Sequence, residues 1–216
     1  IARGKLLNNK EQTFELLMSY YRSAANSYET AFRLSCEHCS EPPYESNAFS
    51  HVSGQLDGCE FEPLYKYCQV LLTSGVLEGQ IPTALQLLEV AAESEHGKSC
   101  GLLGNYLYDD GQYFRALYFL EKAAEQLDDA GLCGLFFYYS DGKAITADYN
   151  KALHYLELGL AQGSVQCTGV LGGAYFNGTG VVMDRNKGVE LAKQAMQKGS
   201  LQAYHFVKEV ELNAMK

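Results

Sequence analysis

Four cysteines in the first third of the chain are the side chains best suited to chemistry. Cys36 and Cys39 form a Cys-x-x-Cys pair around Glu37-His38, and Cys59 and Cys68 follow. This spacing can hold zinc or exchange a disulfide. Eight residues separate Cys59 from Cys68, whereas a second pair of zinc ligands is spaced by about two to four.

We therefore favour a structural disulfide that joins Cys36 or Cys39 to Cys59 or Cys68 and ties down the polar connector 40–60. The alternatives are ordinary thiols, a zinc site, or a redox motif, and the last needs a βαβ context that the sequence lacks. A disulfide would favour an exported, periplasmic location over a cytoplasmic one. The chain starts Ile-Ala-Arg-Gly without a leader, which we interpret as a processed start that leaves the compartment open.

No other set of residues has catalytic spacing. The five histidines are scattered without an HxxxH or HExxH pair, and no GxSxG, phosphate-binding or dinucleotide-binding fingerprint is present. The sequence therefore predicts a protein that is not an enzyme and that has no cofactor and no metal. The runner-up, a metal-binding or redox protein, would use the cluster from Cys36 to Cys68.

Composition excludes further classes. The chain has 216 residues, 47% of them apolar, and 26 acidic against 17 basic residues give a formal net charge of −9. A phosphate backbone would be repelled by this charge, so nucleic acid is excluded as a partner. The sequence contains no run of about 18 apolar residues, which would predict a membrane span.

A repeat occupies the rest of the chain, in four copies at 61–97, 98–131, 132–163 and 164–199. Small residues recur at one position, Ala84, Ala116, Ala152 and Gly188, spaced by 32, 36 and 36 residues. Apolar spacings of 3, 4 and 7 within each copy are helical, and Gly-containing turns in mid-repeat divide each copy into two helices. Each copy closes on a glycine, at Gly97, Gly131, Gly163 and Gly199. Such helical hairpins bury their apolar faces only by stacking.

The last copy carries a family motif. Residues 171–184, LGGAYFNGTGVVMD, resemble the core of SEL-one-like repeats, relatives of the tetratricopeptide repeat. The resemblance implies an all-α, right-handed solenoid of stacked helix-turn-helix repeats that binds other proteins as a scaffold or adaptor, as many bacterial members do. We expect a capping helix at 200–216, and one or two helices within 10–39 as part of an N-terminal segment 1–60. Cys100, Cys133 and Cys167, spaced by 33 and 34, should share one buried position.

Aromatic residues supply the candidate binding surface. The chain has 16 Tyr and 10 Phe, and in this architecture the first helix of each repeat lines the concave face. Adjacent aromatics cannot all enter one core, so some should face a partner. The predicted partner-binding residues are Asn105, Tyr108, Asp109, Phe137, Tyr138, Asp141, Phe176 and Asn177.

The predicted function is non-catalytic binding of a protein or peptide, with a basic partner favoured by the acidic charge. The alternative is an immunity protein that neutralises a secreted bacterial toxin. A monomer is compatible with the sequence, which does not identify the oligomeric state.

Overall fold

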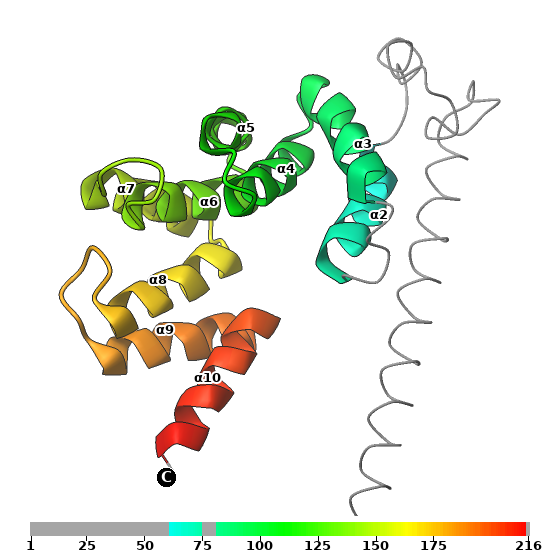
Figure 1. Ribbon diagram of the computed structural model, residues 1–216. Coiled ribbons are helices and arrows are strands. Elements are labelled where there is room, and N and C mark those ends of the chain that lie inside the picture. Colours follow the sequence, from blue (N-terminus) through cyan, green and yellow to red (C-terminus); the bar gives the residue numbers. More distant parts are fainter. Residues whose placement is uncertain (1–60, 75–80, 215–216) are drawn as a thin grey trace, which may run out of the picture. The chain divides into compact units, whose positions relative to one another are not determined.

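The computed structural model describes residues 61–74 and 81–214. The predicted N-terminal helices, the connector and Cys36, Cys39 and Cys59 lie outside the described residues. Within them every regular element is an α-helix, which confirms the all-α class (Figure 1). The helices are α2 (Phe61–Ser74), α3 (Ile81–Glu93), α4 (Gly97–Asp109), α5 (Tyr113–Glu125), α6 (Asp129–Ser140), α7 (Tyr149–Ala161), α8 (Val165–Asn177), α9 (Arg185–Gln197) and α10 (Leu201–Ala214).

The chain divides into two units, 1–94 and 95–216, and the first contributes the hairpin of α2 and α3. Its interior is aliphatic, with Leu64, Leu71 and Leu88 fully buried. Cys68 is also buried and is a free thiol, whose Sγ donates to the carbonyl oxygen of Ala84 at 3.5 Å. The structure gives no support for the predicted disulfide at Cys68, whose side chain is buried in the α2–α3 core.

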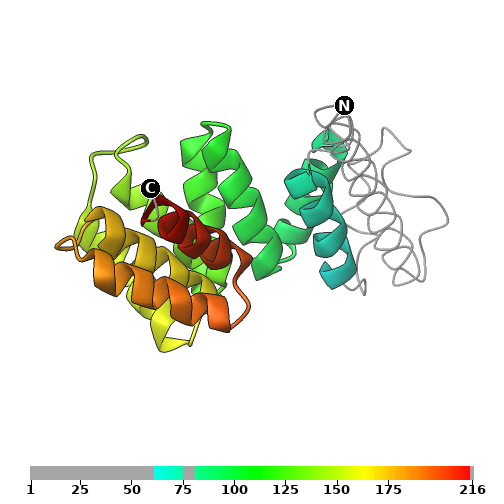
Figure 2. The same cartoon turned by 90° about the horizontal axis from the view of Figure 1, so that it is seen from below.

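The second unit stacks three hairpins and a final helix. α4 packs on α5, α6 on α7 and α8 on α9, while α4 also packs on α6 and α6 on α8. The last helix, α10, packs on α9, and Figures 1 and 2 both show the two lying side by side. The small residues predicted at helix contacts, among them Ala116, Ala152 and Gly188, are buried.

Glycines mark the predicted turns in the middle of each hairpin. Gly111, Gly142 and Gly178 have φ of 82°, 71° and 75°, a left-handed conformation that residues with a Cβ atom rarely adopt. Gly75, which should mark the first hairpin's turn, lies outside the described residues. The prediction is confirmed for the other three hairpins.

The prediction that each repeat ends on a glycine was partly wrong. Gly163 and Gly199 do end their helices in the left-handed conformation, but the matching positions after α3 and α5 hold Glu95 (φ 60°) and Leu127 (φ 57°). Gly97 and Gly131 instead lie in the first turns of α4 and α6 and are buried. There is no room for a Cβ atom on Gly131, which lies against Ala123.

The three cysteines of the second unit do not share one position. Measured from their N-caps His96, Asp128 and Ser164, Cys100 follows by four residues, Cys133 by five and Cys167 by three. They therefore lie on different faces of α4, α6 and α8. All three are buried as predicted.

Candidate functional site

The eight predicted partner-binding residues fall into three groups in the structure. Tyr108, Tyr138 and Asn105 belong to the packing between repeats. Asp109, Asp141 and Phe137 are exposed, the last at 47%. Phe176 and Asn177 line a cavity.

The rings of Tyr108 and Tyr138 are buried, at 8% and 2% exposure, with centroids 5.9 Å apart. Tyr108 Oη donates to Asp141, and Lys143 Nζ lies 3.0 Å from the same carboxylate. Burial and the hydrogen bond to Asp141 both raise the pKa of Tyr108. The cluster joins the end of α4 to the loop after α6, so Tyr108 and Tyr138 hold neighbouring repeats together and offer little surface to a partner.

Asn105 has a similar structural role. Its Nδ2 donates to the carbonyl oxygen of Ala130 at 3.0 Å, which connects α4 to the first turn of α6. Its Oδ1 lies against Gly134, where a Cβ atom would not fit. The side chain is thus committed to helix packing, and its assignment to a binding surface is not supported.

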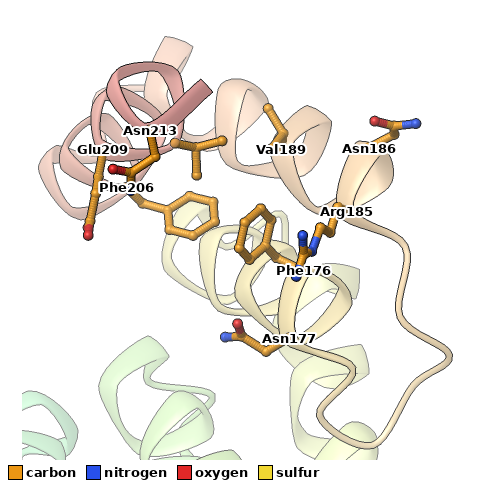
Figure 3. A pocket seen from close by; sticks show the side chains of 9 residues that line it. Phe176, Asn177, Arg185, Asn186, Val189, Phe206, Glu209 and Asn213 are labelled. Atoms are coloured by element: carbon orange, nitrogen blue, oxygen red, sulfur yellow. The ribbon is translucent and has the colours of Figure 1, made fainter. Parts of the chain in front are cut away.

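A cavity of about 420 Å³ lies between α8, α9 and α10. Two phenylalanines form its aromatic wall, Phe176 from α8 and Phe206 from α10, with ring centroids 5.1 Å apart at 87° (Figure 3). Val189 and Val210 add aliphatic surface. The full lining is Phe176, Asn177, Arg185, Asn186, Val189, Phe206, Glu209, Val210 and Asn213.

Polar groups surround this apolar wall. The Arg185 guanidinium lies 5.5 Å from the centroid of the Phe176 ring, a cation–π distance. Arg185 and Glu209 form no ion pair with any residue that the structure describes. The amides of Asn177, Asn186 and Asn213 complete the lining. The cavity therefore combines an aromatic wall with one cation, one anion and three amides.

Sequence reasoning missed the contribution of α10. The sequence predicts a capping helix here, and the structure shows that Glu209 of this helix lines the cavity, whereas Lys208 and Glu211 pair with each other at 3.0 Å. The spacing of Phe206, Val210 and Asn213, four and then three residues, does place them on one face of a helix and could have indicated the site.

A second cavity of about 160 Å³ adjoins the first, and Phe206 lines both. Along α8 its lining includes Gly169, Val170 and Gly173. Counted from the N-caps Asp128 and Ser164, Gly169 takes the place of Cys133 and Gly173 the place of Phe137. A Cβ atom on Gly173 would meet nothing within 4 Å. α8 therefore lacks the side chains that α6 carries on this face, and the space beside α10 stays open.

The described residues contain no group of three His, Cys, Asp or Glu side chains placed to hold a metal ion. In the same part of the chain no helix is both long and apolar enough to cross a membrane.

Comparison with known proteins identifies the repeat. The model of the Sel1 repeat, the repeat that the LGGAYFNGTGVVMD motif resembles, matches residues 97–126, 130–164 and 170–200. No curated protein matches the chain.

Solved structures of Sel1 repeat proteins are also similar to the chain. A Sel1 repeat protein from Oxalobacter formigenes is 25% identical over 56% of this chain and 95% of that one, with a TM-score of 0.43. The protective antigen c5321 of uropathogenic Escherichia coli, which displays an SLR fold, is 20% identical over 73% of this chain, with a TM-score of 0.51. The aligned part spans 35% of c5321. This second likeness confirms the SLR fold.

Proposed function

Because residues 97–200 belong to the Sel1 repeat family, whose repeats are generally protein-interaction modules, we propose that this protein binds a protein or peptide partner without catalysis. The site is the cavity between α8, α9 and α10, and its occupant is an apolar side chain of the partner. The observation that carries the proposal is the aromatic wall of Phe176 and Phe206 in an open cavity of about 420 Å³.

The cavity has the composition of a binding site. Such sites are concave, mostly apolar and of about 300–1,000 Å³, with a few polar groups that fix the ligand's orientation. Two rings at right angles leave edges and faces for a third aromatic or aliphatic group. Burying one such side chain from water contributes about 1.5–3 kcal/mol.

The rim suits a polypeptide. Side-chain amides can both donate to and accept from a peptide backbone, and Asn177, Asn186 and Asn213 are all placed at the cavity. Glu209 would pair with a basic residue of the partner and Arg185 with a carboxylate or carbonyl oxygen. The net charge of −9 favours approach by a basic or mixed-charge segment.

A narrower role is the inhibition of a secreted toxin. The observation that favours it is the strong acidity of these 216 residues, a net charge of −9, which would complement a basic toxin surface. Both roles would use the same cavity. A toxin that is neutralised by the wild-type chain but not by a cavity variant would select the inhibitor role.

The test is partner capture by matched variants. The immobilised wild-type chain is compared with Phe176→Ala and with a control, Phe114→Ala, whose ring is on α5 and 91% exposed. We expect Phe176→Ala to weaken partner binding at least about 10-fold, as loss of an aromatic anchor does, and Phe114→Ala to have no effect. Unchanged binding by a folded Phe176→Ala, checked by circular dichroism, would refute the cavity as the site.

A further inference from the structure

Two buried thiols of neighbouring repeats meet inside the second unit. Cys133 of α6 and Cys167 of α8 are 2% and 0% exposed, and their Sγ atoms lie 2.9 Å apart. A disulfide bond is about 2.0 Å long, so the distance between the two sulfurs would need to shorten by only about 0.9 Å. Nothing in the proposed partner binding uses this pair.

We propose that Cys133 and Cys167 are an oxidation site, at which peroxide converts the two thiols to a disulfide that links α6 to α8. Both sulfurs are enclosed, so the oxidant must be small and must enter by local opening. Hydrogen peroxide meets this requirement better than a bulky disulfide, which would have to form a mixed disulfide inside the core.

The residues around Cys167 hold its side chain against Cys133. The side chain packs against Gly159 of α7, where there is no room for a Cβ atom. Its backbone is fixed by the N-cap, since the Cys167 N–H donates to Ser164 Oγ at 3.0 Å. The sulfur is thus confined between α6 and α7 instead of turning to solvent.

The electrostatics favour one thiol as the nucleophile. The hydrogen bond from Cys133 lowers the pKa of Cys167, and the same hydrogen bond together with burial raises the pKa of Cys133. The Cys167 thiolate would attack the peroxide O–O bond and form a sulfenic acid with release of hydroxide. Cys133 would then attack this sulfur, forming the S–S bond and displacing a second hydroxide. The two thiol protons convert both hydroxides to water, so two thiols and one peroxide yield one disulfide and two waters.

Peptide mapping of the full chain tests the proposal. After peroxide treatment and alkylation, trypsin places Cys133 in peptide 123–143 and Cys167 in peptide 152–185, each without another cysteine. We expect these two peptides to be cross-linked, with the loss of two hydrogens, and to separate on reduction. Recovery of both peptides alkylated, or of sulfinic or sulfonic acids at these cysteines, would overturn the proposal.

Thermal unfolding gives a second readout. A cross-link that closes a loop of this length should raise the unfolding midpoint of the oxidised chain by about 5–10 °C, reversibly with reductant. Cys167→Ala should abolish the rise in the unfolding midpoint. The control Cys68→Ala removes a buried thiol that is hydrogen-bonded to the carbonyl oxygen of Ala84, and it should still show the rise. An equal rise in Cys167→Ala would assign the effect to other cysteines. If Cys167→Ala does not fold, the peptide map of the wild-type chain decides.

Discussion

Gly172 of α8 and Gly188 of α9 bring the backbones of the two helices into contact. A Cβ atom on Gly188 would lie 2.7 Å from the carbonyl oxygen of Gly172, and also 2.7 Å from the backbone nitrogen of Phe176. Backbone atoms cannot move aside as a flexible side chain can. The close approach also sets the position of Phe176, and through it the wall of the proposed binding cavity.

Gly188→Ala should therefore destabilise the fold by about 2–3 kcal/mol, because the added methyl group forces α8 and α9 apart. The free energy of unfolding, measured by denaturant titration, checks this. The control is Gly173→Ala, also in this hairpin, where a Cβ atom would meet nothing within 4 Å. There the better helix propensity of Ala should stabilise by up to about 1 kcal/mol. Equal effects of the two substitutions would contradict this account of the contact.

The residues that follow the second helix of each repeat give a prediction about backbone strain. Leu127 has φ 57° where the later repeats have Gly163 and Gly199, and a left-handed conformation costs a residue with a Cβ atom about 1–2 kcal/mol. Leu127→Gly should relieve this and raise the free energy of unfolding by about 0.5–1 kcal/mol. Gly163→Ala should lower it by about 1 kcal/mol. The same sign for both changes would show that backbone strain does not decide these positions.

The repeat could be predicted from the sequence because its signals are local. Ala116, Ala152 and Gly188 recur at helix contacts that every hairpin must make, and Gly142 and Gly178 occupy turns that need positive φ. The ends of the repeats were harder to assign. The sequence predicts helix ends at Gly97 and Gly131, whereas the structure packs both in first turns. Glycine serves both left-handed turns and close packing, and only the fold separates the two uses.

The cavity that we propose as the binding site was predicted only in part, because the exposure of a side chain depends on neighbouring repeats. Tyr108 and Tyr138 have the composition of a binding surface, but the Asp141 loop and the adjacent ring bury them. Phe176 and Asn177 were identified from their helix alone. Glu209 was missed because its role depends on where α10 packs, which the repeat pattern does not specify.

Asp141 gives a prediction about pH. Burial acts to raise the pKa of this carboxyl group, but hydrogen bonds from Tyr108 and Lys143 outweigh burial and lower it. A lowered pKa in the folded state stabilises the fold above the unfolded value of about 3.9, and this stability is lost as the pH falls through the folded value.

Asp141→Asn should thus lower the free energy of unfolding at pH 7. The expected loss is about 1 kcal/mol, because water screens the interactions of this partly exposed carboxylate. The difference from wild type should shrink below about pH 4. Asp109→Asn removes the same charge without touching the hydrogen bond to Tyr108, so its effect should stay within about 0.5 kcal/mol. A pH-independent difference for Asp141→Asn would exclude the titration of this carboxyl as the cause.

Gly173 offers a way to fill the second cavity, which adjoins the proposed binding site, without disturbing the core. Gly173→Phe places on α8 the ring that Phe137 supplies on α6, in space that is open beside α10. We expect partner affinity to fall about 10-fold or more while the unfolding midpoint stays near that of Gly173→Ala, which should still bind. Full affinity of Gly173→Phe would show that the partner does not approach along α8.

Photo-crosslinking tests the central claim, that the partner occupies the cavity between α8, α9 and α10. A benzophenone amino acid is placed at Asn177 on the cavity rim or, as the control, at exposed Phe114 of α5, and each chain is irradiated with its captured partner. We expect a covalent partner adduct from position 177 and none from position 114. An adduct from position 114 with none from position 177 would contradict it.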